Sequence, residues 1–314
     1  MLTIVPGPIE VAALTTQPAR SCAPSPQAAV CDTMANRLLA PAGLVWGAGT
    51  VKKPRSGVLE VGGAPAPLAH AGEALQALVV EASGAQKTAA GHRATAVAAV
   101  TRAVRDVPPD DELFRPHLRK ALEESSGSSV VPTPKTTVTD EHGLARVLLA
   151  YGVEQGRDRP ASEIEAHPAA AAFPGAVPPE AKRVRRALRI DTAVPDWHGT
   201  GLYAAPGEVV TLRTSQRAAE AGLRLRIGAH KDRLWGKPAW HRVPEITRPW
   251  PVSARKTEGA CAFGGLVYVV VPRGTKLGTI EVALEGGVEA PRFVLGETTN
   301  QAWEKELRDL DAPW

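Results

Sequence analysis

Hydrophobic residues recur with a helical period in the first half of the chain. Between Leu68 and Gly152, apolar positions are spaced three to four residues apart, as on one face of an amphipathic helix. This spacing predicts helices at residues 68–82, 88–104, 110–124 and 140–152. The last helix follows Asp140, a suitable N-cap, and places Leu144, Val147, Leu148 and Tyr151 on one stripe. A small helical domain over residues 66–157 is therefore expected.

The second half carries the pattern of β-strands. Segments bounded by glycine or proline have this pattern at residues 207–214, 223–229, 265–272, 278–286 and 291–296. The run GLVYVVVP at 265–272 predicts a strand that is buried on both faces. No helix-length crossover separates the strands, which favours an antiparallel sandwich over βαβ units. The predicted fold class is α+β and multidomain, with a helical N-terminal region followed by an antiparallel β-sandwich-like region that is truncated.

Other segments complete the predicted organisation. Residues 1–65 are rich in Pro, Gly, Ala and Ser without a sustained period, which predicts a poorly ordered lead-in. Residues 158–190 predict a linker and a short helix, with Pro179 suited to its first turn. The basic run AKRVRRALR at 181–189 is interpreted as a solvated helix face or an interdomain link, with an anionic partner as the alternative. Residues 191–314 form the β-rich region.

Composition narrows the classes of function. Hydrophobic residues make up 44% of the chain and charged residues 22%, so the chain is expected to fold. The formal charge is +4, but most basic residues are interleaved with acidic ones, which argues against a nucleic-acid partner. No stretch reaches the roughly 18 consecutive apolar residues of a membrane span. The N-terminus lacks the features of a secretory signal, so either the protein is cytoplasmic or its true start lies upstream.

Cysteine and tryptophan are unevenly placed. Cys22 and Cys31 are able to form one disulfide in an oxidising compartment, and Cys261 is expected to be buried beside the apolar run at 262–271. All of the seven tryptophans except Trp46 lie from Trp197 onward. This skew again separates the two halves of the chain.

The sequence carries no complete catalytic motif. Residues 46–57 lack the glycine order and the Gly-Lys-Ser/Thr ending of a phosphate-binding loop. Neither a Gly-x-Ser-x-Gly elbow nor a His-Glu-x-x-His zinc helix is present. His70 and Glu73 have a His-x-x-Glu spacing, but no second histidine accompanies them, so a structural role is expected. No residue is therefore assigned a catalytic or metal-binding role, and no cofactor is expected in this chain.

Several residues are candidates for ligand binding, each with a structural alternative: Trp197, His198, His230, Asp232, Trp240, Gly264 and Gly265. Trp197 with His198 fits a sugar-binding surface, because indoles stack on the apolar faces of pyranose rings, although burial in a sandwich core is the commoner fate of tryptophan. Trp235, Trp240 and Trp250 extend this alternative.

The remaining candidates are interpreted mainly as structural. His230 and Asp232 lie at a strand end, where a turn is a simpler explanation than a ligand pair. His241 is similarly ambiguous. Gly264 and Gly265 remove side chains where another backbone or a ligand comes close, and close packing is the default interpretation.

Ordered sequence blocks in the second half add a family resemblance. They are FPGAVP (173–178), WHGTGLYAAPGE (197–208), LRLRIGAHKDRLW (223–235), RVPEI (242–246), FGGLVYVVVP (263–272), VEAPRFVLGETT (288–299) and the end of the chain from Trp303. Together they resemble the enhancin-like zinc metallopeptidases of peptidase family sixty, which include mucin-degrading peptidases and the related channel-associated factors. The resemblance covers roughly residues 165–314 and leaves the helical half unmatched.

The resemblance implies a β-rich front part followed by a catalytic subdomain that holds zinc on a His-Glu-x-x-His helix. In such enzymes zinc activates water and the motif glutamate acts as general base. This sequence ends where that subdomain would begin, so we expect an inactive portion of a secreted or cell-surface enzyme whose intact form binds zinc and cuts glycoproteins. The alternative is an inactive protein-interaction or carbohydrate-binding module.

Overall fold

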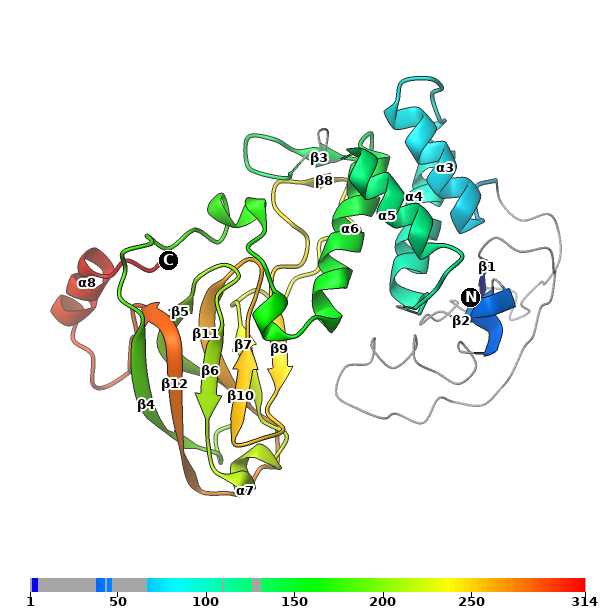
Figure 1. The fold of residues 1–314 in the computed structure, drawn as a ribbon. Coiled ribbons are helices and arrows are strands. Elements are labelled where there is room, and N and C mark those ends of the chain that lie inside the picture. The colour runs from blue at the N-terminus through cyan, green and yellow to red at the C-terminus, as the bar shows by residue number, and fades with distance from the viewer. Residues whose placement is uncertain are drawn as a thin grey trace, which may run out of the picture. The chain divides into compact units, whose positions relative to one another are not determined.

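The computed structural model describes residues 2–4, 38–42, 44–46, 67–108, 110–125 and 131–313 (Figure 1). The chain divides into two compact units, Met1–Val130 with Val138–Gln155, and Val131–Thr137 with Gly156–Trp314. Most of the lead-in predicted for residues 1–65, including the Cys22–Cys31 pair, lies outside the described residues. None of the described helices is long and apolar enough to cross a membrane.

The first unit is helical. Its helices are α3 (Ala71–Ala82), α4 (Ala90–Asp106), α5 (Arg115–Ser125) and most of α6 (Gly143–Asp158). The strands β1 (Leu2–Ile4) and β2 (Leu44–Trp46) pair antiparallel, and η1 (Ala40–Ala42) is a short 3-10 helix. Each of the four helices predicted from the hydrophobic period is present, so these predictions are confirmed.

The apolar stripes of these helices meet in one core. Its largest fully buried side chains are Leu78 of α3, Phe114 of the turn before α5, Leu118 of α5 and Tyr151 of α6. Val147, Leu148 and Tyr151 of the predicted α6 stripe are buried, and Leu144 packs against them. Burial of such stripes, more than helix propensity, stabilises helices of this length.

Polar side chains fix the ends of these helices. Asp111 accepts hydrogen bonds from the backbone N–H groups of Phe114 and Arg115, at 2.6 and 2.9 Å, at the start of α5. Asp140 is not the N-cap of α6, because this helix begins at Gly143. Asp140 instead forms an ion pair with Arg146.

The second unit is a strongly curled antiparallel sheet (Figure 1). Its strands are β4 (Val184–Asp191), β5 (Asp196–Ala204), β6 (Val210–Arg213), β7 (Arg224–Ile227), β9 (Arg248–Pro251), β10 (Lys256–Gly259), β11 (Gly265–Val271) and β12 (Thr279–Glu289). The short strands β3 (Val138–Thr139) and β8 (Ala239–Trp240) lie outside this sheet. The short helices are η2 (Ala161–Glu163), η3 (Pro168–Ala171), α7 (Gln216–Ala219) and α8 (Asn300–Asp309).

The strand order is β10-β6-β12-β5-β11-β7-β9, with β4 also pairing with β12. Strand β12 has a bulge between Glu285 and Gly287. It pairs with β6 before the bulge and with β5 after it, and its pairing with β4 continues across the bulge to Gly287. The two end strands approach each other, since the indole N–H of Trp250 on β9 donates to the carbonyl of Ala260, 2.9 Å away and directly after β10. The predicted α+β class is confirmed, and the β-region is one curled sheet.

The basic run predicted to be helical is strand β4. Arg185 Nε lies 3.2 Å from Glu285 Oε1, and Arg186 Nη2 lies 2.7 Å from Glu289 Oε1 on β12. Acidic residues spaced four apart on β12 therefore face the arginines of β4, and opposite-charge pairs across strands stabilise a sheet. The helix prediction is wrong because a local pattern does not reveal these distant partners.

Other strand predictions need correction. The segment PRFVLG at 291–296 is irregular, whereas β5 and α8 were not predicted. Strand β11 is not buried on both faces, because its residues alternate between buried and half-buried positions. Val267, Val269 and Val271 face the core, while Tyr268 and Val270 face outward. The outward residues matter for the candidate site.

Candidate functional site

The sheet brings together some of the residues that the sequence analysis predicted to bind a ligand. Trp197 on β5 and the loop that carries His230 and Asp232 after β7 meet at the outer face of the sheet through Arg226. His198, Trp240, Gly264 and Gly265 have other surroundings. The structure also adds Gly199, Arg226, Lys231 and Tyr268, which the sequence analysis did not single out.

Aromatic rings and cations share this outer face. Tyr268 on β11 is paired with Gly199 on β5 and with Arg226 on β7. The rings of Trp197 and Tyr268 are 5.1 Å apart. The guanidinium carbon of Arg226 lies 4.0 Å from the centre of the Trp197 ring, and the Lys231 ammonium lies 5.2 Å from it. The Trp197 face consists of Trp197, Gly199, Arg226, Lys231 and Tyr268. The two cations in it lie against electron-rich rings.

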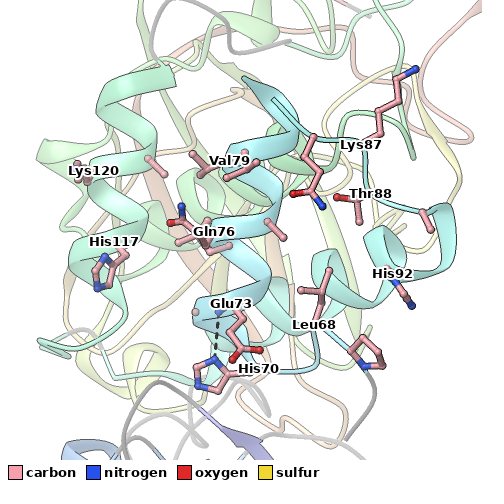
Figure 2. A pocket seen from close by; sticks show the side chains of 18 of the residues that line it. Leu68, His70, Glu73, Gln76, Val79, Lys87, Thr88, His92, His117 and Lys120 are labelled. Carbon is pink, nitrogen blue, oxygen red and sulfur yellow. Dashed lines mark hydrogen bonds between the residues drawn. The ribbon is translucent and has the colours of Figure 1, made fainter. Parts of the chain in front are cut away.

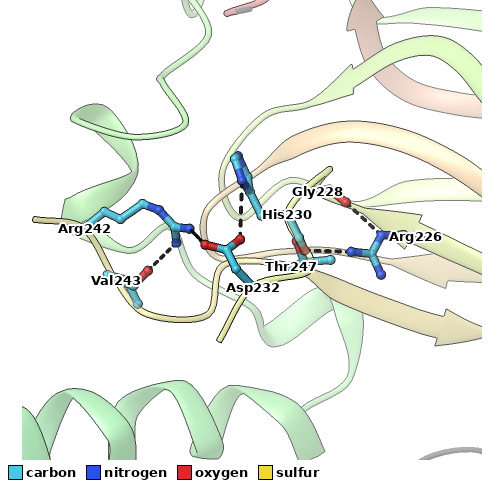
Figure 3. A network of polar contacts seen from close by, with 7 residues as sticks. All are labelled: Arg226, Gly228, His230, Asp232, Arg242, Val243 and Thr247. Carbon is cyan, nitrogen blue, oxygen red and sulfur yellow. Dashed lines mark hydrogen bonds and ion pairs between the residues drawn. The ribbon is translucent and has the colours of Figure 1, made fainter. Parts of the chain in front are cut away.

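A polar network holds the adjoining loop in place (Figure 3). Arg226 donates through Nε to the carbonyl of Gly228 at 3.0 Å and through Nη2 to that of His230 at 2.7 Å. The hydroxyl of Thr247 donates to the same His230 carbonyl at 2.8 Å. The guanidinium plane of Arg226 is therefore fixed over Trp197, and the loop that carries Lys231 is tied to β7.

His230 and Asp232 point toward each other but do not form a catalytic dyad (Figure 3). Their nearest atoms, His230 Nδ1 and Asp232 Oδ1, are 3.7 Å apart, which is too long for a hydrogen bond. Asp232 pairs with Arg242. Burial and the positive charge of Arg242 lower the pKa of His230, against the opposing effect of Asp232. His230 is thus kept neutral near pH 7 beside an Asp–Arg pair.

The stability of the second unit is expected to depend on pH because of two histidines, His167 and His230. Burial lowers the pKa of His167 as it does that of His230. The unfolded chain therefore takes up protons at a higher pH than the folded chain, and stability is full above about pH 6.5 and falls as the pH drops below it. Urea unfolding followed by tryptophan fluorescence at pH 7.5 and 5.0 measures this loss.

Substitution of His167 tests whether this histidine causes the loss of stability at low pH. His167 Nδ1 accepts a hydrogen bond from the backbone N–H of Ala169, 3.1 Å away, at the start of η3. His167→Asn keeps an acceptor there and removes the titrating ring. We expect a smaller difference between the two pH values for this variant. An unchanged difference would show that His167 is not responsible.

The other predicted aromatic residues have structural roles. Trp240 is 2% exposed and its ring meets that of Trp235 edge-on at 5.4 Å. The indole N–H of Trp235 donates to Glu245 at 3.1 Å. His198 is half-buried, with Nε2 2.8 Å from the carbonyl oxygen of Val194. His241 Nδ1 lies 3.1 Å from the hydroxyl of Thr137.

Gly264 and Gly265 are explained by close backbone packing. Gly264 has φ +66°, and a Cβ there would lie 2.5 Å from the carbonyl oxygen of Ala204. A Cβ on Gly265, at φ +134°, would lie 2.8 Å from the Cα of Gly228. Glycine alone fits both positions.

Cys261 is buried, as expected, and burial raises the pKa of its thiol to about 11. Its Sγ donates weakly to the carbonyl oxygen of Ile246, 3.4 Å away. A thiol with a raised pKa is a poor nucleophile at neutral pH.

The helical unit has a separate groove beside α3 (Figure 2). Its volume is about 1030 Å³, and its lining includes His70, Glu73, His92, His117 and Lys120. His70 accepts a hydrogen bond from the backbone N–H of Glu73 at 3.3 Å and caps α3. Across the described part of the chain, no three His, Cys, Asp or Glu residues are grouped to hold a metal ion.

The β-region is similar to known proteins. Residues 179–285 match the family model described as the N-terminal domain of M60-like peptidases. The human TRPM8 channel-associated factor 2 is 37% identical over 118 residues, and the bovine TRPM8 channel-associated factor 1 is 34% identical over 118 residues. Each match covers 38% of this chain but only 13% of the relative. The resemblance to enhancin-like metallopeptidases of family sixty is confirmed.

Solved structures give weaker matches. The IMPa metallopeptidase from Pseudomonas aeruginosa has a TM-score of 0.41 at 16% identity, covering 70% of this chain and 26% of that one. The ZmpB metallopeptidase from Clostridium perfringens has a TM-score of 0.30 at 18% identity, covering 39% of this chain and 28% of that one.

Proposed function

We propose that this chain is a non-catalytic N-terminal portion of an M60-like zinc metallopeptidase whose whole protein hydrolyses glycosylated, mucin-type proteins. The match of residues 179–285 to the N-terminal domain of M60-like peptidases supports the proposal. This range runs from the segment before β4 to the bulge in β12, so the match lies in the curled sheet. The proposed whole enzyme acts at the cell surface or after secretion.

The described residues do not fit a zinc site. Catalytic zinc takes three protein ligands and one open position. The His230–Asp232 pair has Arg242 as its third member, and a guanidinium is not a metal ligand. His70 already uses Nδ1 to cap a helix. No catalytic step is therefore assigned to the described residues of this chain.

The proposed contribution of the sheet is a rigid frame. Cross-strand ion pairs fasten β4 to β12, and glycine-mediated backbone contacts join β11 to the turn after β5. Loops mounted on such a frame are suited to positioning a large substrate or another domain.

The test is a proteolysis assay on the 314-residue chain. We expect incubation with a mucin and added zinc to give the same fragments as the mucin alone, because the chain has no motif for activating water. Gel electrophoresis stained for glycan reports cleavage, and metal analysis of the dialysed protein reports bound zinc. An active M60 metallopeptidase serves as the positive control. Cleavage by the 314-residue chain that a chelator abolishes would contradict the proposal.

A binding role is the second candidate function, and the Trp197 face favours it. Buried Trp240 is unsuited to such a role, whereas the rings of Trp197 and Tyr268 are only half-buried. A binding module would bind mucin without cleaving it, whereas a purely structural domain would not bind it. Retention of the 314-residue chain on immobilised mucin therefore distinguishes these two roles.

A further inference from the structure

Strand β4 is a border strand of the sheet with an open outer edge. It pairs with β12 along all of Val184–Asp191, and among the described residues no other strand pairs with it. Figure 1 shows β4 at the border of the sheet, next to β12. The outer edge of such a strand presents backbone N–H and C=O groups without a strand partner, so it is able to pair with one further strand.

The other border strands are protected in ways that β4 is not. Strand β9 carries Pro249 and Pro251, which have no N–H group to donate. Strand β10 is approached by β9, whose Trp250 donates to the carbonyl just after β10. Strand β4 contains no proline. Proline and a covering segment are two common means of blocking an edge, and β4 has neither along its second half.

Only the first half of β4 is covered toward β5. Arg186 donates through Nη1 to the carbonyl of Gly201 at 2.9 Å, and its Nη2 pairs with Glu289. An inward charge of this kind also protects an edge, but here it is neutralised and reaches only the start of the strand. No described residue of β5 hydrogen-bonds to residues 187–191. These five residues are called the open edge of β4.

The side chains of β4 differ between its two faces. On the inward face Ile190 is buried, whereas Leu188 is only half-buried because no strand lies beyond it. On the outward face Arg185, Ala187 and Arg189 are exposed. Arg185 pairs with β12, but Arg189 forms no ion pair among the described residues. An added strand would therefore find an uncovered apolar side chain on one face and an unpaired cation on the other.

Strand β12 shows which side-chain pattern pairs well with β4. Its outward residues Glu281, Ala283 and Glu285 lie opposite the outward residues of β4. The residues between them are apolar and buried. Acidic outward positions with apolar inward positions thus complement β4 on its closed side, and opposite charges across strands stabilise the pairing. The same pattern suits the open side.

We propose that the open edge of β4 binds an extended acidic segment of a partner protein as one more antiparallel strand. Backbone hydrogen bonds would hold the segment, a carboxylate would pair with Arg189, and an apolar side chain would cover Leu188. A second copy of β4 is less suitable, since pairing centred on Ala187 places Arg185 opposite Arg189. This inference goes beyond the proposed function, because it assigns a protein partner to this chain's own residues and needs no cleavage.

The probe is a synthetic peptide with the β12 sequence TIEVALE, which is residues 279–285. Saturation-transfer NMR detects weak binding of the peptide to the 314-residue chain, and hydrogen exchange followed by mass spectrometry locates it. We expect residues 184–191 to gain protection, because alternate N–H groups of an edge strand point away from its partner. Protection of β12 should stay the same. Loss of protection in β12 would show that the peptide replaces this strand, which would overturn the proposal.

Modified peptides separate strand addition from simple charge attraction. Two of them carry N-methyl groups on one or the other set of alternate residues, so only one set faces β4. We expect the peptide methylated on that set to bind at least about tenfold more weakly and the other to bind as before. A peptide with lysine in place of both glutamates should bind at least about tenfold more weakly.

One variant tests the charge. Arg189→Glu should weaken binding of the acidic peptide at least about tenfold and favour the lysine peptide instead. Its control is Arg213→Glu, at an exposed position on β6, because both edges of β6 are paired, with β10 and with β12. At physiological salt the control should change binding less than about twofold.

Each result decides the proposal. Protection confined to β4, loss of binding with one methylated peptide and reversal by Arg189→Glu would support it. The methylated peptides carry the test on the unaltered chain if Arg189→Glu does not fold. Equal binding of all peptides, protection at another strand, pairing of β4 with a second copy, or no binding would overturn it. None of these results depends on zinc-dependent cleavage, so the proposed function is tested separately.

Discussion

Gly264→Ala is expected to lower the free energy of unfolding of the β-rich unit by about 4 kcal/mol. The added methyl would lie 2.5 Å from the carbonyl oxygen of Ala204 and 2.9 Å from the backbone nitrogen of Pro206. Both neighbours are backbone atoms, so rotation of a side chain gives no relief. The φ of +66° adds a conformational cost for any residue with a Cβ. Strand β11 would have to shift away from the turn after β5.

Denaturant unfolding measured by tryptophan fluorescence is suited to this variant, because all tryptophans except Trp46 lie from Trp197 onward. Gly274→Ala is the matched control. Gly274 also has a positive φ, at +83°, but no atom lies within 4 Å of its missing Cβ. We expect it to lose only about 1 kcal/mol, the conformational cost. Equal losses in the two variants would show that backbone overlap is not what requires Gly264.

Arg115→Met is expected to lower the free energy of unfolding of the helical unit by about 3 kcal/mol. Arg115 is buried, and its guanidinium donates to three carbonyls at the end of α4. Nε donates to Pro108 at 2.6 Å, and Nη2 donates to Val107 at 2.6 Å and to Val104 at 3.4 Å. The last carbonyl groups of a helix have no partner within the helix. Replacing Arg115 with Met therefore leaves these buried acceptors without a hydrogen bond.

Far-ultraviolet circular dichroism follows this variant, because the helices lie mainly in this unit. Arg119→Met removes the same charge from an exposed position one turn further along α5 and should change stability by less than about 0.5 kcal/mol. Arg115→Lys should give an intermediate loss, since one ammonium cannot span all three carbonyls. A loss no larger than that of Arg119→Met would contradict the capping role.

The hydrophobic period was sufficient to predict the helices and several strands. Leu144, Val147, Leu148 and Tyr151 lie on the stripe that their spacing predicts, because a helix fixes the direction of each side chain locally. Strand β4 could not be predicted in this way. Its arginines are paired with glutamates about a hundred positions later in the chain, and no short window contains both partners.

The candidate site was predicted only in part. Trp197 and the His230–Asp232 loop were singled out from residue types with recognised chemistry. Tyr268, Arg226 and Gly199 were not, because each has an ordinary structural explanation when it is considered alone. Trp240 was also a reasonable candidate, but its burial was decided by packing against Trp235.

The sequence by itself determined the division into a helical and a β-rich half, the positions of the main helices and the resemblance to M60-like peptidases. These properties depend on local periodicity or on ordered blocks of residues. The tertiary structure alone decided that β4 is a strand, which tryptophans are buried, and that Trp197, Tyr268 and Arg226 meet on neighbouring strands. The physical reason is that strand pairing and burial depend on contacts between residues far apart in the chain, which no local pattern specifies.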